Sequence, residues 1–251
     1  MEGGFYRQEL PRSLQRKYDA VLRALVAQRK RIPVGNMQMT QYWKVEKAIR
    51  RDAPEIFFLK SSAFAYYPVT RRCEIEPQYR FAAPACAAIR SAMEARTAPF
   101  LGAVRALPER ERAREIHDLL ARKTTYRDPE APYSHEAPGP LLYGIGVCEG
   151  IAKAFKFLAD RAGLPCLVVY GRDAHSGTGH AWNLVRVDGA FFHVDATYDL
   201  TPPEEPQIRR AYFLRTEAEI LRTHIPDDDF ALPRAPGPEN LCSPLYQSAR
   251  I

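Results

Sequence analysis

The sequence predicts a mixed fold of helices and antiparallel strands, and three observations support this. Apolar residues recur at helical spacing in several segments, a cysteine stands at the start of one of these helices, and an Asp-Gly pair separates two strand-like segments. Of the 251 residues, 46% are hydrophobic and 26% are charged, which is typical of a globular protein with a real core. This length suits one large domain, or a domain with a smaller partner.

The chain is expected to divide into an N-terminal accessory region, residues 1–104, and a catalytic domain with a C-terminal tail, residues 105–251. In the first region a helical stripe is formed by Leu14, Tyr18, Val21, Leu22, Leu25 and Val26. A second helix is expected over 41–51, short strands over 56–59, 63–67 and 73–81, and a further helix over 84–93. These segments contain no group of residues that indicates chemistry, so we interpret them as structural.

The second region is expected to begin with a helix, for which Pro108 and Glu109 are a suitable start. The segment from Asp128 to Pro140 contains four prolines and a glycine, a composition that predicts an irregular loop. A loop beside a reactive residue often shapes the site.

A candidate nucleophile follows this loop. Residues 144–163 carry one apolar face at helical spacing, with Lys153 and Lys156 on the polar side, and Gly163 is a natural helix end. Cys148 then lies in the first turn, where unpaired N–H groups and the helix dipole favour thiolate over thiol. The same N–H groups could bind an oxyanion. A cysteine in this place is by itself more often structural than catalytic, so the prediction depends on what else the chain provides.

A predicted hairpin provides the partners. If Asp188 and Gly189 are its turn, Val187 faces Ala190, and His180 and Asp195 become diagonal neighbours on one face. Diagonal side chains are within reach of an imidazole–carboxylate hydrogen bond. Each residue alone has an ordinary structural explanation. Together with the cysteine at a helix start, however, they indicate a Cys-His-Asp triad.

These segments resemble a known family. GVCEGIAKAFKFLADRAGLPC resembles the nucleophile helix of the transglutaminase-like superfamily, and GHAWNLVRVDGAFFHVDATYD resembles its His–Asp hairpin. Flanking segments, IHDLLARKTTY and AYFLRTEAEI, resemble bacterial members, so the likeness covers residues 107–222. It implies a papain-like α+β core, in which the nucleophile helix packs on an antiparallel sheet. It also implies roles for three residues: Cys148 as nucleophile, His180 as base and acid, and Asp195 as the group that orients the histidine.

The donors that would hold the oxyanion are less clear from the sequence. Papain-type enzymes use a side-chain donor, but no glutamine stands shortly before Cys148. Tyr126 and Trp182 are the candidates for oxyanion binding or substrate positioning, and Trp182 is expected to pack beside the histidine. His193 lies on the same strand face as Asp195 and is interpreted as a structural neighbour.

The implied activity is thiol-dependent acyl transfer on peptide or glutamine amide bonds. We favour a cysteine peptidase-like hydrolase, because no amine-binding module is evident in the catalytic region. A protein-glutamine transglutaminase or deamidase would use the same triad. A non-catalytic protein-interaction module is the alternative from another class, although no triad residue is missing.

Composition argues against several other functions. The net charge of +6 comes from scattered residues without a basic block, so a main role with nucleic acid is not expected. The five cysteines include no CxxC pair and the histidines lack paired ligand spacing, so neither a metal nor a cofactor is predicted. No apolar segment suits a membrane span or a signal peptide, which favours a cytoplasmic location. The expected partner is a protein or peptide substrate.

Overall fold

A computed structural model describes residues 4–127 and 130–236. The chain forms two compact units, Met1–Ala95 and Arg96–Ile251, which are described separately below. The division falls inside the long helix α4 (Ala83–Val104), which continues well beyond the expected end at residue 93. Pro99 lies within this helix.

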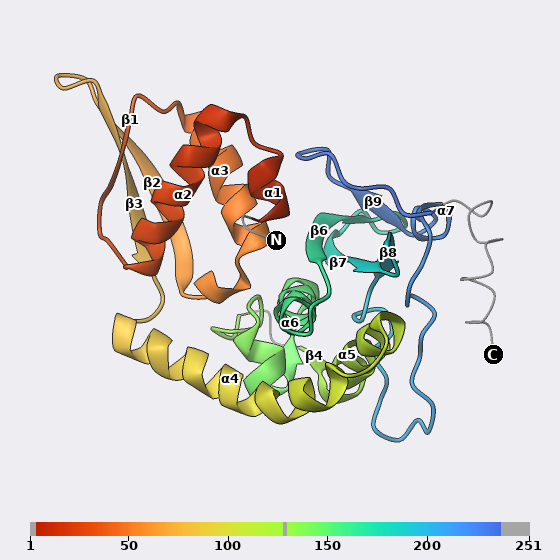
Figure 1. Ribbon diagram of the computed structural model, residues 1–251. Helices are drawn as coiled ribbons and strands as arrows, with labels where there is room; N and C mark the ends of the chain where they lie inside the picture. Colours follow the sequence, from red (N-terminus) through yellow and green to blue (C-terminus); the bar gives the residue numbers. More distant parts are fainter. Residues whose placement is uncertain (1–3, 128–129, 237–251) are drawn as a thin grey trace. The chain divides into compact units, whose positions relative to one another are not determined.

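The first unit combines helices with a three-stranded antiparallel sheet (Figure 1). Its helices are α1 (Phe5–Gln8), α2 (Arg12–Val26) and α3 (Met39–Asp52), and its strands, in the sheet order β1-β3-β2, are β1 (Ile32–Gly35), β2 (Leu59–Tyr67) and β3 (Arg72–Tyr79). The predicted stripe of α2 is buried at Leu14, Tyr18, Val21 and Leu25. The strand expected at 56–59 was wrong except at its last residue, because Pro54–Ile56 forms a 3-10 turn that the proline starts and β2 begins at Leu59.

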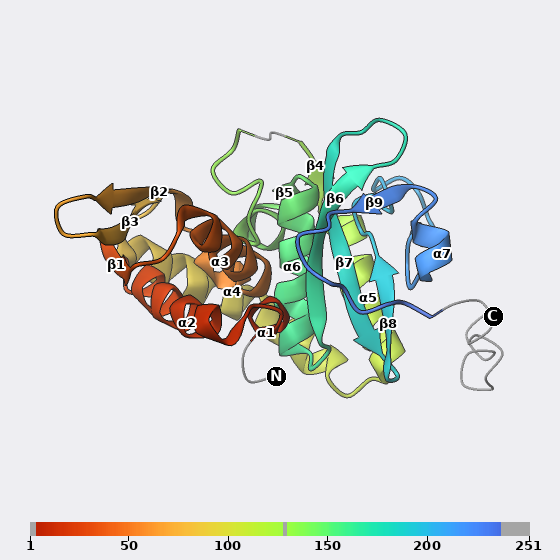
Figure 2. The ribbon, with the colours of Figure 1, turned by 90° about the horizontal axis from the view of Figure 1, so that it is seen from above.

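The second unit is built on a four-stranded antiparallel sheet of order β8-β7-β6-β9. Its strands are β6 (Cys166–Asp173), β7 (Gly179–Val187), β8 (Ala190–Val194) and β9 (His224–Pro226). The helix α6 (Cys148–Arg161) lies along β6 and β7, and α5 (Glu109–Lys123) contacts both α6 and β7 (Figure 2). A short helix, α7 (Glu217–Ile220), precedes β9. This mixture of helices and antiparallel strands confirms the predicted fold class.

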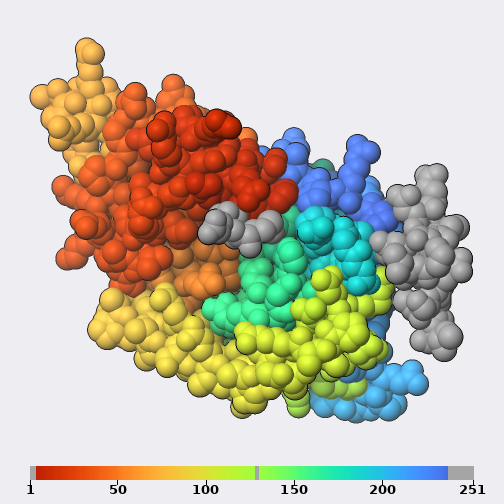
Figure 3. All heavy atoms as spheres, in the orientation of Figure 1, coloured from red at the N-terminus to blue at the C-terminus, as the bar shows by residue number. Residues whose placement is uncertain are grey.

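The start of α5 also contacts the far end of the hairpin. The backbone N–H of Asp188 donates to Glu109 at 2.7 Å, and the two segments lie side by side in the space-filling view (Figure 3). The expected helix start at Pro108 is confirmed, since Pro108 is the N-cap of α5. The hairpin turn is therefore held by α5 at one end, while its other end reaches the site described below.

The segment before α6 is more ordered than its proline content predicts. Asp128 and Pro129 lie outside the described residues, but Gly139–Tyr143 form a π-helical turn (η2) that includes Pro140, so the expected loop ends earlier than Pro140. A two-stranded parallel ribbon, β4 (Thr125–Tyr126) with β5 (Ile145–Gly146), then leads to α6.

Close packing against α6 fixes this segment. A Cβ at position 150 would lie 2.2 Å from the carbonyl oxygen of Ser134, so only glycine admits this approach. The same carbonyl accepts a hydrogen bond of 3.0 Å from the N–H of Val147, the residue before Cys148. The start of α6 is thus tied to the preceding segment by backbone contacts.

The polar face that the sequence assigned to α6 is buried, contrary to expectation. Lys153 is 3% exposed and pairs with Glu136 at 2.9 Å and Glu149 at 2.8 Å. Lys156, 7% exposed, bonds to Asp160 and to the carbonyl of Cys166. Because α6 packs on the sheet and is also covered by η2 and α5, its lysines need internal partners. No helix in the described ranges has both the length and the apolar character needed to cross a bilayer.

Candidate active site

The β7–β8 hairpin has the predicted register. Asp188 and Gly189 form the turn with φ of 51° and 85°, the left-handed values that an Asp-Gly turn of type I′ requires. Val187 pairs with Ala190, and the ladder continues to Asn183 opposite Val194. Asp195 directly follows β8, one residue beyond this ladder.

His180 and Asp195 are in contact, as the predicted register requires. His180 Nε2 lies 2.6 Å from Asp195 Oδ2, with His180 8% and Asp195 1% exposed. The other carboxylate oxygen, Oδ1, accepts from the backbone N–H groups of Thr197 at 2.8 Å and Tyr198 at 3.3 Å. The carboxylate is therefore satisfied on both oxygens and fixed in one orientation.

Cys148 completes this group. It is the first residue of α6, after the N-cap Val147, and its side chain hydrogen-bonds to His180. Because Nε2 of His180 already faces Asp195, the nitrogen left for Cys148 is Nδ1. Cys148 is partly exposed, whereas Cys73, Cys86 and Cys166 are buried; Cys242 lies outside the described residues.

These contacts perturb the ionisation of the pair. Burial alone would lower the pKa of His180, but its hydrogen bonds with Asp195 and Cys148 raise the pKa from 6.5 to about 9. Burial would raise the pKa of Asp195, yet the hydrogen bonds from His180 and His224 lower it to about 2. The stability that the raised pKa of His180 contributes is complete below pH 6.5 and is lost as the pH rises through about 9.

Tyr126 also reaches the cysteine. The parallel ribbon pairs Tyr126 with Gly146, two residues before Cys148. Burial raises the pKa of Tyr126, the charge and side chain of Cys148 raise it further, and the backbone N–H of Cys148 partly opposes the shift. The tyrosine oxygen thus lies beside the first-turn N–H that an oxyanion would use.

Trp182 packs beside the histidine, with ring centroids 6.0 Å apart. Its indole N–H donates to His193 Nδ1 at 3.0 Å, and His193 Nε2 lies 3.2 Å from Glu217. The indole N–H is already engaged and buried, so in this structure it is not free to bind an oxyanion. His193 contacts Trp182 and Glu217 rather than Asp195.

His224 is the residue that the sequence analysis missed. It is fully buried at the start of β9, and its Nε2 lies 3.0 Å from Asp195 Oδ2, the same oxygen that contacts His180. Strand β9 pairs with β6, not with the hairpin. No local pattern could have revealed the contact, because it depends on the position of a short edge strand.

These three side chains are the group in the described residues that could hold a metal. One ligand atom from each of His180, Asp195 and His224 lies within 4.8 Å of the others. The two imidazole nitrogens are already hydrogen-bonded to Asp195 Oδ2, however, and a metal would have to replace both contacts. We therefore assign the group to hydrogen bonding.

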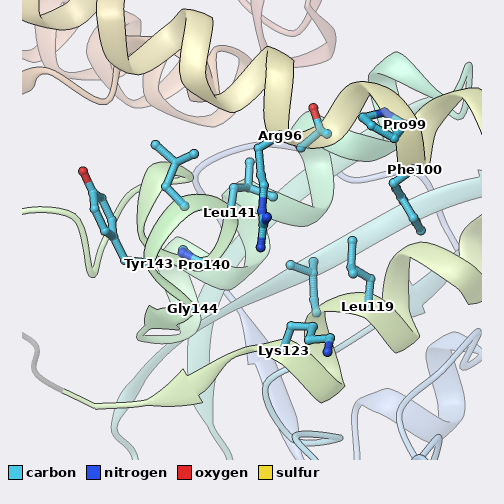
Figure 4. A pocket seen from close by; sticks show the side chains of 12 residues that line it. Arg96, Pro99, Phe100, Leu119, Lys123, Pro140, Leu141, Tyr143 and Gly144 are labelled. Carbon is cyan, nitrogen blue, oxygen red and sulfur yellow. The ribbon is translucent and has the colours of Figure 1, made fainter.

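A cavity of about 580 Å³ lies at the other end of the β4–β5 ribbon (Figure 4). Gly144 and Lys123, which precede the two ribbon strands, line it together with Arg96, Leu119 and Leu141, among others. Cys148, His180 and Asp195 are not among its lining residues. The hollow is therefore separate from the place where the cysteine and histidine meet.

Taken together, the helix and sheet define the class of protein: a papain-type α+β domain in which a helix that begins at a cysteine packs on an antiparallel sheet carrying a histidine. Residues 102–196 match the model of the transglutaminase-like superfamily. No curated protein sequence matches the chain.

Two solved structures are similar to parts of the chain. One is described as a candidate cysteine protease from Cytophaga hutchinsonii, at 20% identity and a TM-score of 0.31, with 34% of this chain and 30% of that chain covered. The other is described as a TGase, at 14% identity and a TM-score of 0.38, with 71% of this chain and 52% of that chain covered. The chain thus spans about a third and about half of the two proteins' lengths.

Proposed function

We propose that residues 105–251 form a thiol-dependent acyl-transfer enzyme that acts on peptide or glutamine amide bonds, with residues 1–104 as an accessory region. The observation that carries the proposal is the placement of one imidazole between two partners. His180 contacts Asp195 through Nε2 and hydrogen-bonds to Cys148 on its other side. A nucleophile, a base and an orienting carboxylate in this order are what covalent catalysis by a thiol requires.

In the proposed mechanism, Cys148 reacts as a thiolate paired with protonated His180. The sulfur attacks the amide carbonyl, and the oxyanion forms next to the N–H of Cys148. Tyr126, which interacts with Cys148, is the candidate second donor to that oxyanion. His180 then gives its proton to the departing nitrogen, which leaves a thioester on Cys148.

The second half of the reaction decides the class of enzyme. His180, now neutral, takes a proton from the incoming nucleophile as that nucleophile attacks the thioester. Water gives a peptidase or a deamidase, and a protein amine gives a transglutaminase. We favour the peptidase-like hydrolase, since the described part of the second unit is a single helix-and-sheet domain without an evident amine site.

Incubation of the full chain with dimethylcasein, with and without dansylcadaverine, tests this proposal. Mass spectrometry would show new peptide termini for a peptidase, glutamate in place of glutamine for a deamidase, or dansylated glutamine for a transglutaminase. We expect new termini, and no product with Cys148→Ala. If neither the full chain nor Cys148→Ala forms any of these products, and neither forms a covalent adduct with a peptide aldehyde, the domain is a non-catalytic module.

A further inference from the structure

The buried histidine on β9 is not used by the mechanism above, yet it contacts the orienting carboxylate. His224 is fully buried, and Trp182, Tyr198 and Tyr212 surround its ring at centroid distances of 4.7, 5.0 and 5.7 Å. It cannot touch a substrate from this position. Any effect on the reaction must pass through Asp195.

The contacts of the ring define what it can offer. Thr223 Oγ1 donates to the carbonyl of Ile220 at 3.3 Å and lies 2.8 Å from His224 Nδ1. Because the carboxylate of Asp195 can only accept a hydrogen bond, the proton of the contact with His224 lies on Nε2. Its Nε2–H then points at Asp195 Oδ2, 3.0 Å away.

Two roles are conceivable for this hydrogen bond, and the other contacts of the carboxylate decide between them. If His224 oriented Asp195, the carboxylate would depend on it. However, Oδ1 is already held by the N–H groups of Thr197 and Tyr198, which fix the carboxylate plane without His224. What His224 adds is a second donor on Oδ2, the oxygen that His180 needs.

We propose that His224 sets the basicity of His180 by sharing Asp195 Oδ2, so that less of the carboxylate charge stabilises the imidazolium. His224 acts only through Asp195 and is therefore a positioning residue, not a catalytic one. The inference rests on the proposed triad and adds a fourth member. A lower basicity of His180 would favour catalysis, because a general acid works best when its pKa is not far above the working pH. The charged or titratable groups that face His224 are Asp195, His180, Tyr198 and Tyr212.

A matched pair of variants separates the donor from the bulk of the side chain. His224→Gln keeps an N–H donor, and His224→Met has a similar size and no donor. Both are made in full-length Cys148→Ser protein, and the pKa of His180 is measured by NMR. We expect His224→Met to raise the pKa of His180 by about half to one unit, and His224→Gln to stay within about 0.2 units of its parent.

An unchanged pKa of His180 in folded His224→Met protein would overturn the inference. A lowered pKa would also overturn it, because it would mean that His224 orients the carboxylate. If His224→Met does not fold, ¹⁵N spectra of the parent provide the test: a proton on Nε2 of His224 is required. A bare Nε2 would overturn the inference. Because Cys148 is absent from this protein, the outcome does not depend on whether the thiol is reactive.

Discussion

Asp195→Asn is expected to lower the turnover of a peptide amide by about 10³- to 10⁴-fold, the loss typical when an orienting aspartate of a triad is replaced. Asp195 Oδ2 accepts hydrogen bonds from both His180 and His224. The amide of an asparagine at this position can offer the two histidines only one uncharged oxygen. Loss of the charge also removes a main cause of the raised pKa of His180. We therefore expect the pKa of His180 to fall well below 9 in the variant, as measured by NMR.

Asp188→Asn is the matched control for this substitution. It lies in the turn of the same hairpin, where asparagine is favoured before glycine. It weakens only a partly exposed ion pair with Arg110 at 3.5 Å, which contributes little to stability. Turnover should stay within about twofold of the wild type. If Asp195→Asn were as active as Asp188→Asn, Asp195 would have no role in orienting the histidine.

Lys153→Ala is expected to lower the free energy of unfolding substantially, because it removes a buried cation from α6. The ammonium lies 2.9 Å from the buried Glu136 and 2.8 Å from the part-buried Glu149 and is 3% exposed, so removing it takes a cation from a buried carboxylate. Breaking a buried pair in this way costs about 3 to 5 kcal/mol. Urea unfolding at pH 7 measures the change.

Two further variants establish the cause. Lys123→Ala, on the exposed end of α5, should change the free energy of unfolding by no more than about 0.5 kcal/mol. Lys153→Met combined with Glu136→Gln removes both members of the most buried pair and should recover much of the loss. A loss in the double variant as large as in Lys153→Ala would show that the side-chain volume, rather than the unpaired charge, is responsible.

The central motif was predictable because its geometry is local. Asp188 and Gly189 set a turn whose register places His180 and Asp195 together, and the apolar stripe of α6 places Cys148 in a first turn. Short-range rules of hairpin and helix geometry are sufficient for both. The roles of these residues stay proposals that depend on the experiments above.

Features that depend on tertiary packing could not be predicted. To predict the burial of Lys153, one must know that the segment carrying His135 and Glu136 packs against α6. To predict the contact of His224 with Asp195, one must know that β9 pairs with β6. No repeated sequence pattern links these two segments. The π-helical turn at Gly139–Tyr143 arises in a proline-rich segment that a local reading assigns to loop.

The pH dependence of iodoacetamide labelling at Cys148, in wild type and His180→Ala and read by peptide mass spectrometry, tests the central claim most directly. A free thiol labels in proportion to its thiolate, with a pKa of about 8.5. We predict that wild-type labelling persists well below that pH, because protonated His180 stabilises the thiolate, and that His180→Ala loses this labelling. Slow labelling that follows an ordinary thiol in both proteins would contradict the account.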